Sequence, residues 1–173
     1  MAPISWTRRS YEATVLLIPL DPAARTWVDT RDPAALEGIT VADAGLLARQ
    51  DDFRPEPVPA SGQAGEGTAT SSPLDLAVHE ADVVVVLAED LAAVDGDTVV
   101  HIGDAARATG TLLGAVIVTP DARWSGEAAQ QVVTTIREAA DNVILLKDPG
   151  LALAFLQVLR GGTREAELAG ATP

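Results

Sequence analysis

Three short, uninterrupted apolar runs constrain the fold of this chain more than any other feature. They are Thr14–Leu20, Asp82–Ala88 and Leu112–Thr119, and a fourth run, Asn142–Leu146, follows. A strand with one face in water alternates apolar and polar residues, whereas a strand buried on both faces is apolar throughout. The runs therefore predict a parallel sheet, with Val83–Leu87, Leu113–Val118 and Val143–Leu146 as its central strands.

Helical patterns separate and follow these runs. They cover Asp97–Thr109, Ser125–Ala140 and Pro149–Arg160, with Ser125 predicted to cap the second helix. Buried strands that alternate with helices are typical of an α/β fold with right-handed crossovers. We therefore expect a three-layer, Rossmann-like α/β domain, with a mainly parallel sheet and helices on both faces.

The chain has 173 residues, and 47% of them are hydrophobic, which suits one domain with a substantial core. We expect that domain to span residues 1–160. The stretch Asp51–Pro73 is rich in Pro, Gly, Ser and Thr, and it is predicted to be a flexible insertion. The end of the chain, residues 161–173, is predicted to be a flexible tail.

Charge and residue usage exclude several classes of function. Twelve basic residues against 25 acidic ones give a net charge of −13, and Lys147 is the one lysine, so nucleic acid is not expected as a partner. The absence of cysteine excludes a thiol nucleophile and cysteine-ligated metals. Two histidines, His79 and His101, leave little for a histidine metal site. We expect each of them to be a structural or a surface residue, and we expect no cofactor and no catalytic residue.

No apolar stretch approaches the roughly 18 residues of a membrane-spanning helix, so no membrane span is predicted. The run that follows Arg8 and Arg9 is short and lacks a small-residue cleavage site, so we expect a cytoplasmic protein rather than a secreted one. The abundance of alanine and arginine with a single lysine is typical of a bacterial genome rich in G and C.

Between Ala81 and Gly126, several motifs occur in a fixed order without gaps. They are Ala81-Asp82-Val83-Val84, Ala106-Arg107-Ala108-Thr109-Gly110, Ile117-Val118-Thr119 and Trp124-Ser125-Gly126, and the run Ile136–Leu146 follows. This arrangement resembles the second half of the nucleotide-binding domain of the FtsZ/tubulin family, the bacterial cell-division GTPases. Upstream, Thr14–Ile18 and Leu36–Ala44 resemble the family's first two strands more weakly.

The departures from that family fall on its GTP-binding loops. The glycine-rich phosphate loop of the family corresponds here to Leu91–Asp97, which keeps none of the family's five glycines. Glycine is needed in such a loop because backbone N–H groups must approach the phosphates closely. The loop after the first strand reads Pro19–Pro22, and the family's sugar-contacting Glu is Ser125 here. The resemblance therefore implies a domain that has lost GTP binding.

Four residues are candidate contacts for a ligand or partner. Arg123 and Trp124 follow a buried strand, where open α/β sheets place ligands, and could stack a base or anchor a partner; alternatively, Trp124 packs under the loop. Asp95 and Asp97 faintly resemble a metal loop, but we favour a turn in which Asp97 caps the next helix. Lys147 and Asp148 end another strand, where a solvated position is favoured.

These observations favour a non-catalytic FtsZ/tubulin-like domain that acts as a protein-interaction or assembly module. Its partner would be a tubulin-like filament, another protein or a second copy of the chain. The alternative is a small α/β enzyme or small-molecule-binding protein that uses the carboxyl edge of the sheet. No convergent set of acid, base and nucleophile supports that alternative. An unconventional nucleotide binder is the third hypothesis, and the loss of the phosphate-loop glycines argues against it.

Overall fold

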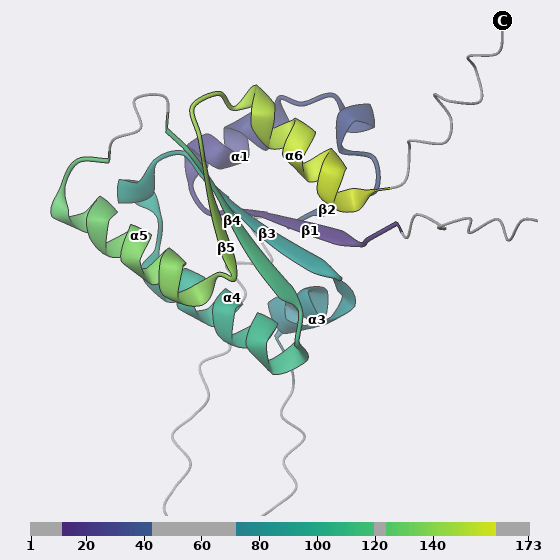
Figure 1. The fold of residues 1–173 in the computed structure, drawn as a ribbon, viewed down its shortest axis with the longest axis horizontal. Coiled ribbons are helices and arrows are strands. Elements are labelled where there is room, and N and C mark those ends of the chain that lie inside the picture. The colour runs from purple at the N-terminus through teal and green to yellow at the C-terminus, as the bar shows by residue number, and fades with distance from the viewer. Residues whose placement is uncertain (1–11, 43–71, 120–123, 162–173) are drawn as a thin grey trace, which may run out of the picture.

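A computed structural model describes residues 12–42, 72–119 and 124–161. Five parallel strands form one sheet in the order β2-β1-β3-β4-β5. Helices cover both of its faces (Figure 1). The predicted three-layer α/β fold is therefore confirmed. The strands are β1 (Val15–Pro19), β2 (Ile39–Val41), β3 (Val83–Ala88), β4 (Leu112–Val118) and β5 (Asn142–Leu146).

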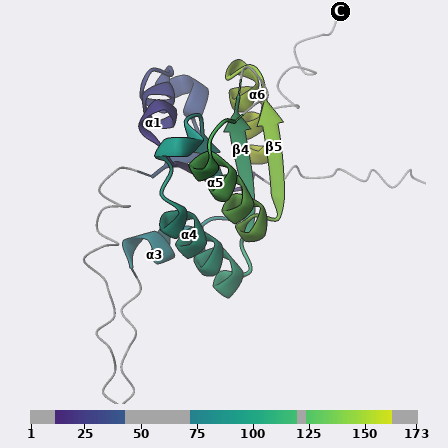
Figure 2. The same ribbon diagram turned by 90° about the vertical axis from the view of Figure 1, so that its left-hand side faces the viewer.

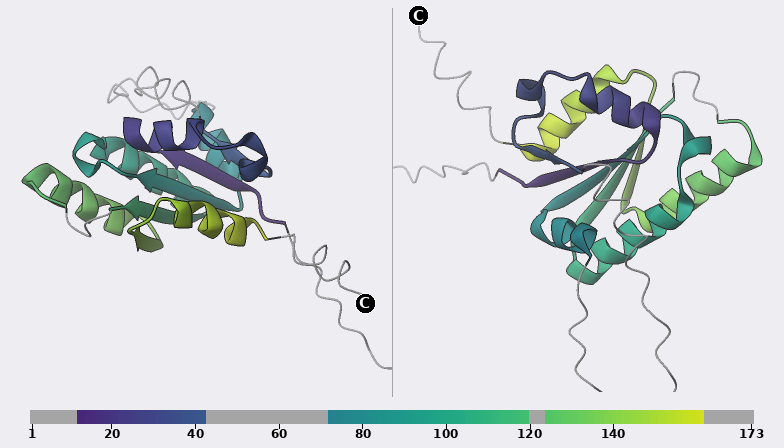
Figure 3. Two further views of the ribbon diagram at one scale, coloured as in Figure 1. Left: turned by 90° about the horizontal axis from the view of Figure 1, so that it is seen from above. Right: turned by 180° about the vertical axis from the view of Figure 1, so that it is seen from behind.

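The helices divide into two layers, each with its own apolar core. The layer formed by α1 (Pro22–Asp29) and α6 (Gly150–Arg160) covers one face, and these helices pack on residues such as Leu17 and Val85. The other layer consists of α3 (Pro73–Glu80), α4 (Gly96–Thr109) and α5 (Glu127–Ala139), which pack on residues such as Ile18 and Val86. In Figure 1 the first layer lies above the sheet and the second below it. Figure 3 shows α1 and α6 from above. Two short 3₁₀ helices, η1 (Pro33–Leu36) and η3 (Leu91–Ala93), complete the described elements.

The set of central strands differs from the prediction. β1 pairs with both β2 and β3, and all five of its residues are buried, so β1 is a central strand. β5 pairs with β4 alone and lies at the outer edge of the sheet (Figure 2). Its prediction as a central strand was wrong. Its apolar sequence resembles that of a buried strand. Leu145 is nevertheless 50% exposed, because no described strand lies beyond the outer edge of β5.

Two helix starts also differ from the prediction. The insertion was predicted to end at Pro73, but Pro73 is already the first residue of α3. Ser72 and Asp75 form a capping box at the start of that helix. Residues 51–71 and 162–173, predicted to be flexible, lie outside the described residues. The start of α5 has no side-chain cap, and Gly126 stands at the N-cap with a φ of 98°. The prediction that Ser125 caps this helix was therefore wrong.

The two ends of the described domain meet at the amino edge of the sheet. The amide of Ala13, just before β1, donates to the carbonyl of Arg160 at 2.9 Å. The Arg160 guanidinium in turn donates to the carbonyl of Glu37, beside β2. These two bonds connect the end of α6 to the starts of both β1 and β2, so the last helix closes the domain.

Candidate functional site

The carboxyl edge of the sheet is where an open α/β fold binds ligands, at the point where the chain changes direction across the sheet. Here that point lies between β1 and β3, because β1 has β2 on one side and β3 on the other. The chain leaves these strands through Leu20–Asp21 and Glu89–Asp90, so acidic side chains occupy the switch point. A ligand bound at this edge would therefore lie next to these acidic side chains.

Asp21 is the best-buried carboxylate of this edge, with only 3% of its surface exposed. Its Oδ1 accepts from the amides of Ala23 and Ala24 at 2.9 and 3.0 Å, and its Oδ2 accepts from the amide of Glu89 at 2.8 Å. Asp21 therefore caps α1 and links the end of β1 to the end of β3. The sequence prediction missed this residue, although an Asp before a Pro at a helix start is a signal for such a cap.

Two further helix starts at this edge, those of η3 and α4, are also capped by an aspartate. Asp90 accepts from the amide of Ala92 at 3.1 Å at the start of η3. Asp95 caps α4, and its carboxylate accepts from the amides of Asp97 and Thr98 at 3.3 and 3.1 Å. The prediction that Asp97 caps α4 was wrong by half a turn, since Asp97 lies exposed in the first turn of the helix.

A hydrogen bond from Thr98 shifts the pKa of the Asp95 carboxyl. The hydroxyl of Thr98 donates to Oδ2 of Asp95 at 2.6 Å. This bond lowers the pKa of the Asp95 carboxyl below its ordinary value of 3.8, although partial burial opposes it. Asp95 therefore stays ionised at neutral pH and keeps a negative charge at the start of α4.

A small cavity of about 190 Å³ lies between the ends of β3 and β4. Glu89, Leu91, Thr119, Trp124 and Ala129 are among the residues that line it. Trp124 is half-buried and packs against the apolar core that includes residues of α4 and α5, as well as lining this cavity. Arg123, the other candidate contact, lies outside the described residues.

Glu89 is the one carboxylate at this cavity with a raised pKa. Partial burial raises the pKa of Glu89 above its ordinary value of 4.5, the Asp21 carboxylate raises it further, and the Arg31 guanidinium lowers it. A raised pKa means that the folded protein holds this proton more tightly than the unfolded chain does. Negative charge is therefore disfavoured at the switch point even for the protein's own side chain.

This shift gives a prediction for pH. The contribution of Glu89 to stability should fall as the pH rises from about 4.5 towards the higher pKa of the folded state, and then stay constant. The variant Glu89→Gln should lack that fall and be slightly more stable than the wild type at neutral pH. Urea midpoints over roughly pH 4 to pH 7 measure this. Asp95→Asn is the matched control with the opposite sign, because the lowered pKa of Asp95 stabilises the fold at neutral pH. A loss of stability in both variants would contradict the assignment for Glu89.

Both histidines lie away from the carboxyl edge, in a groove between α3 and α4. His101 Nε2 is 3.2 Å from an oxygen of Asp75, within ion-pair distance, and His79 lies in the last turn of α3. The groove has a volume of about 520 Å³, and Leu76 and Ala105 also line it. Across residues 12–42, 72–119 and 124–161, no three His, Asp or Glu side chains converge as metal ligands would.

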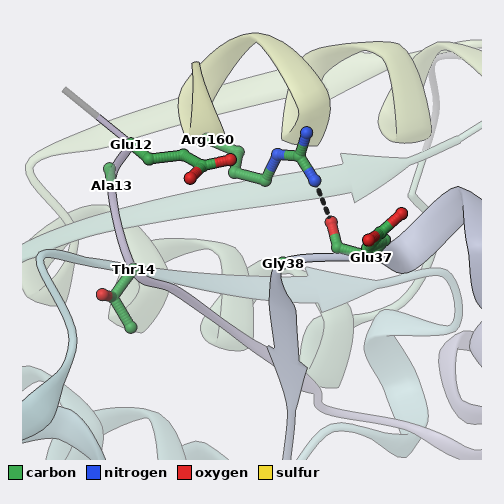
Figure 4. Close-up of a pocket in the computed structure, with 6 residues that line it drawn as sticks. All are labelled: Glu12, Ala13, Thr14, Glu37, Gly38 and Arg160. Atoms are coloured by element: carbon green, nitrogen blue, oxygen red, sulfur yellow. Dashed lines mark hydrogen bonds between the residues drawn. The ribbon is translucent and has the colours of Figure 1, made fainter. Parts of the chain in front are cut away.

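A third cavity, of about 530 Å³, opens at the amino edge, opposite the switch point. Figure 4 shows the Arg160 side chain lying across it, with its hydrogen bond to the Glu37 carbonyl. A Cβ on Gly38 would come within 2.8 Å of that side chain, and Gly38 has a φ of 76°. Glycine therefore leaves the space that Arg160 needs. Glu12 and Thr14 also line this cavity, and the arginine serves to join elements there.

Lys147, at the end of β5, is exposed, and no acidic group within the described ranges lies within ion-pair distance of it. The neighbouring Asp148 accepts from the amide of Gly150 at 2.8 Å at the start of α6. Asp148 is thus used as a turn residue, while the lysine remains available on the surface. Among the described helices, none is both long and apolar enough to span a membrane.

Comparison with known proteins adds no family to these observations. No protein-family model matches this chain, and no curated protein matches it. The resemblance to FtsZ/tubulin domains therefore rests on the sequence motifs alone, and a function must be argued from the geometry of the site.

Proposed function

We propose that this chain is a non-catalytic protein-interaction or assembly module, a degenerate relative of the FtsZ/tubulin nucleotide-binding domain. One observation carries the proposal. At three helix starts of the carboxyl edge, amides are already bonded to the chain's own carboxylates, Asp21 at α1, Asp90 at η3 and Asp95 at α4. Nucleotide-binding sheets use free amides at such positions to hold phosphate groups.

A phosphate would have to displace these carboxylates, and the electrostatic balance opposes it. A helix N-terminus attracts an exposed anion by about 0.3–1 kcal/mol. Asp95 and Asp97 already hold two negative charges at the start of α4, and the stretch Leu91–Asp97 contains no Lys or Arg. Side chains also stand where the family has glycine. The repulsion therefore outweighs the attraction that the helix offers.

The alternative of a small-molecule site has less support. The cavity beside Glu89 and Trp124 measures about 190 Å³, whereas typical ligand sites measure about 300–1,000 Å³. What supports an interaction role is the apolar surface that the domain leaves uncovered, which includes Leu145 on β5 and Val158 on α6, 50% and 73% exposed. By its resemblance to bacterial cell-division proteins, the proposal places the domain in the bacterial cytoplasm.

Isothermal titration with GTP and with GDP, each with and without magnesium, tests the proposal. We expect no saturable heat up to millimolar nucleotide and no hydrolysis of GTP, because the phosphate-binding amides are occupied. The variant Thr98→Val, which loses the bond that holds Asp95 but keeps its charge, should give the same result. Saturable binding of GTP at micromolar concentrations would overturn the proposal and favour an unconventional nucleotide binder.

A further inference from the structure

The strand β5 is one of the two edges of the described sheet, and with five residues it is longer than the other edge strand, β2, which has three. Its inner side pairs with β4, and no described strand pairs with its outer side. Figure 2 shows β5 beside β4 at the outer limit of the sheet. Sheet edges of this kind are usually protected by proline, bulges or inward charges, because unpaired backbone groups recruit other strands. The segment Asn142–Leu146 contains no proline and no charge.

The backbone of β5 presents its free groups in a defined pattern. The carbonyl of Leu146 accepts from the amide of Thr119 at 2.7 Å, so the backbone groups of Leu146 face β4. Backbone groups alternate in direction along a strand, so those of Ile144 also face β4. The amides and carbonyls of Val143 and Leu145 therefore point away from the sheet, towards a strand that would add there.

We propose that the partner of this edge is a second copy of the chain, whose β5 pairs antiparallel with the first about a two-fold axis at Ile144. The inference rests on the proposed interaction function and names its partner. An axis at Ile144 pairs each residue with the residue of the other copy that lies equally far from Ile144 in the opposite direction, so the two residue numbers always add up to 288. Val143 then faces Leu145 of the second copy, and these are the residues whose backbone groups are free.

Charge complementarity selects this register over its neighbours. It places Asp141 opposite Lys147 of the second copy, and Lys147 opposite Asp141, so two cross-strand ion pairs form. Both side chains are exposed. Asp141 and Lys147 flank the strand rather than belong to it. The amide of Asp141 donates to the carbonyl of Leu113 at 2.8 Å and one of its carboxylate oxygens accepts from the amide of Leu113 at 2.9 Å, which leaves the other oxygen for the long lysine side chain to reach. A shift of two residues would place Lys147 opposite Val143, or Leu145 opposite Asp141, and would lose both pairs.

The net charge makes this surface distinctive. Each copy carries a formal charge of −13, so most pairs of surfaces on two copies repel each other. The edge of β5 carries the chain's only lysine at one end and an aspartate at the other, which is self-complementary under a two-fold axis. The central contact, Ile144 against Ile144 of the second copy, is a pair that is not hydrogen-bonded, in which side chains come closest.

Light scattering after size-exclusion chromatography, over a range of protein concentrations, tests the proposal with two charge variants. Lys147→Glu places Glu opposite Asp141, and Asp141→Lys places Lys opposite Lys147, so each variant repels its own copy. We expect the wild type to form dimers and each variant to dimerise about tenfold or more weakly. An equimolar mixture of the two variants should recover dimers, because the mixed pair restores both attractions. Arg31→Glu makes the same change in charge as Lys147→Glu. Arg31 follows α1, which mainly contacts β1 and β3 rather than β5, so this variant should dimerise as the wild type does.

The outcomes separate this inference from the proposed function. A wild type that stays monomeric at all concentrations, or dimers that Lys147→Glu leaves intact, would overturn pairing through β5, while the nucleotide titration would still decide the proposed function. Circular dichroism checks folding, because Asp141→Lys also loses the bond to Leu113. If that variant does not fold, the comparison of Lys147→Glu with Arg31→Glu decides the proposal alone. Dimers lost equally in both of these would also contradict it.

Discussion

Asp21→Ala is expected to lower the free energy of unfolding by about 2–4 kcal/mol, one of the largest losses that a single polar substitution can cause in this chain. The carboxylate accepts from three backbone amides and is almost completely buried. Alanine leaves those amides without an acceptor in a site that water reaches poorly. For a chain of this length the loss corresponds to a fall in Tm of roughly 5–15 °C. Urea unfolding followed by circular dichroism measures the difference.

Asp32→Ala is the matched control for this prediction. Asp32 also precedes a proline and caps a helical turn, but it is exposed and accepts from one amide, that of Ala34, at 3.0 Å. Its loss should cost about 1 kcal/mol or less. Asp21→Asn should fall between the two, because one oxygen is kept while the new amide group faces the amide of Glu89. Equal losses for Asp21→Ala and Asp32→Ala would show that the link between β1 and β3 adds nothing to the cap.

Leu156→Ala is expected to cost about 2–5 kcal/mol, the range for a buried leucine truncated in a well-packed core. Leu156 is 1% exposed on α6 and belongs to the apolar cluster that also contains Leu17 and Trp27. Its removal leaves a cavity between the last helix and the sheet. Val158→Ala, two residues further along the same helix, should change the stability by no more than about 0.5 kcal/mol, because Val158 is 73% exposed.

Chemical unfolding of the two α6 variants, carried out side by side, makes this comparison. Similar small effects would show that α6 does not cover the sheet as the structure has it. Similar large effects would show that Val158 is buried in solution, which a partner on that surface would explain.

The strands were predictable from the sequence because burial on both faces leaves a mark in each strand's own residues. Val83–Leu87 is apolar throughout, and it is the core of β3. The edge position of β5 was not predictable in this way. Ile144 and Leu145 are as apolar as residues of a central strand, yet Ile144 is only partly buried and Leu145 is exposed, because no described strand lies beyond β5. An apolar strand that lies at an edge is also what a partner strand would select, which agrees with the inference for β5.

The candidate site was harder to predict because its main contact joins distant segments. The bond from the Glu89 amide to Asp21 spans 68 residues, and no local pattern encodes it. The cap of α4 was misplaced for a local reason, since Asp95-Gly96-Asp97 offers two aspartates and either could cap a helix. The packing of Trp124 against the core that includes residues of α4 and α5 likewise joins separate segments.

The central claim is that the chain's own carboxylates occupy the amides with which a nucleotide would be held. An NMR titration of the ¹⁵N-labelled protein with GTP and magnesium tests this claim residue by residue. The amide signals to follow are those of Ala23, Ala24, Ala92 and Thr98. These amides donate hydrogen bonds to the carboxylates of Asp21, Asp90 and Asp95. We predict that all four signals keep their positions up to millimolar GTP. Saturable shifts of these four signals, with GTP but not with an equal ionic strength of salt, would contradict the claim.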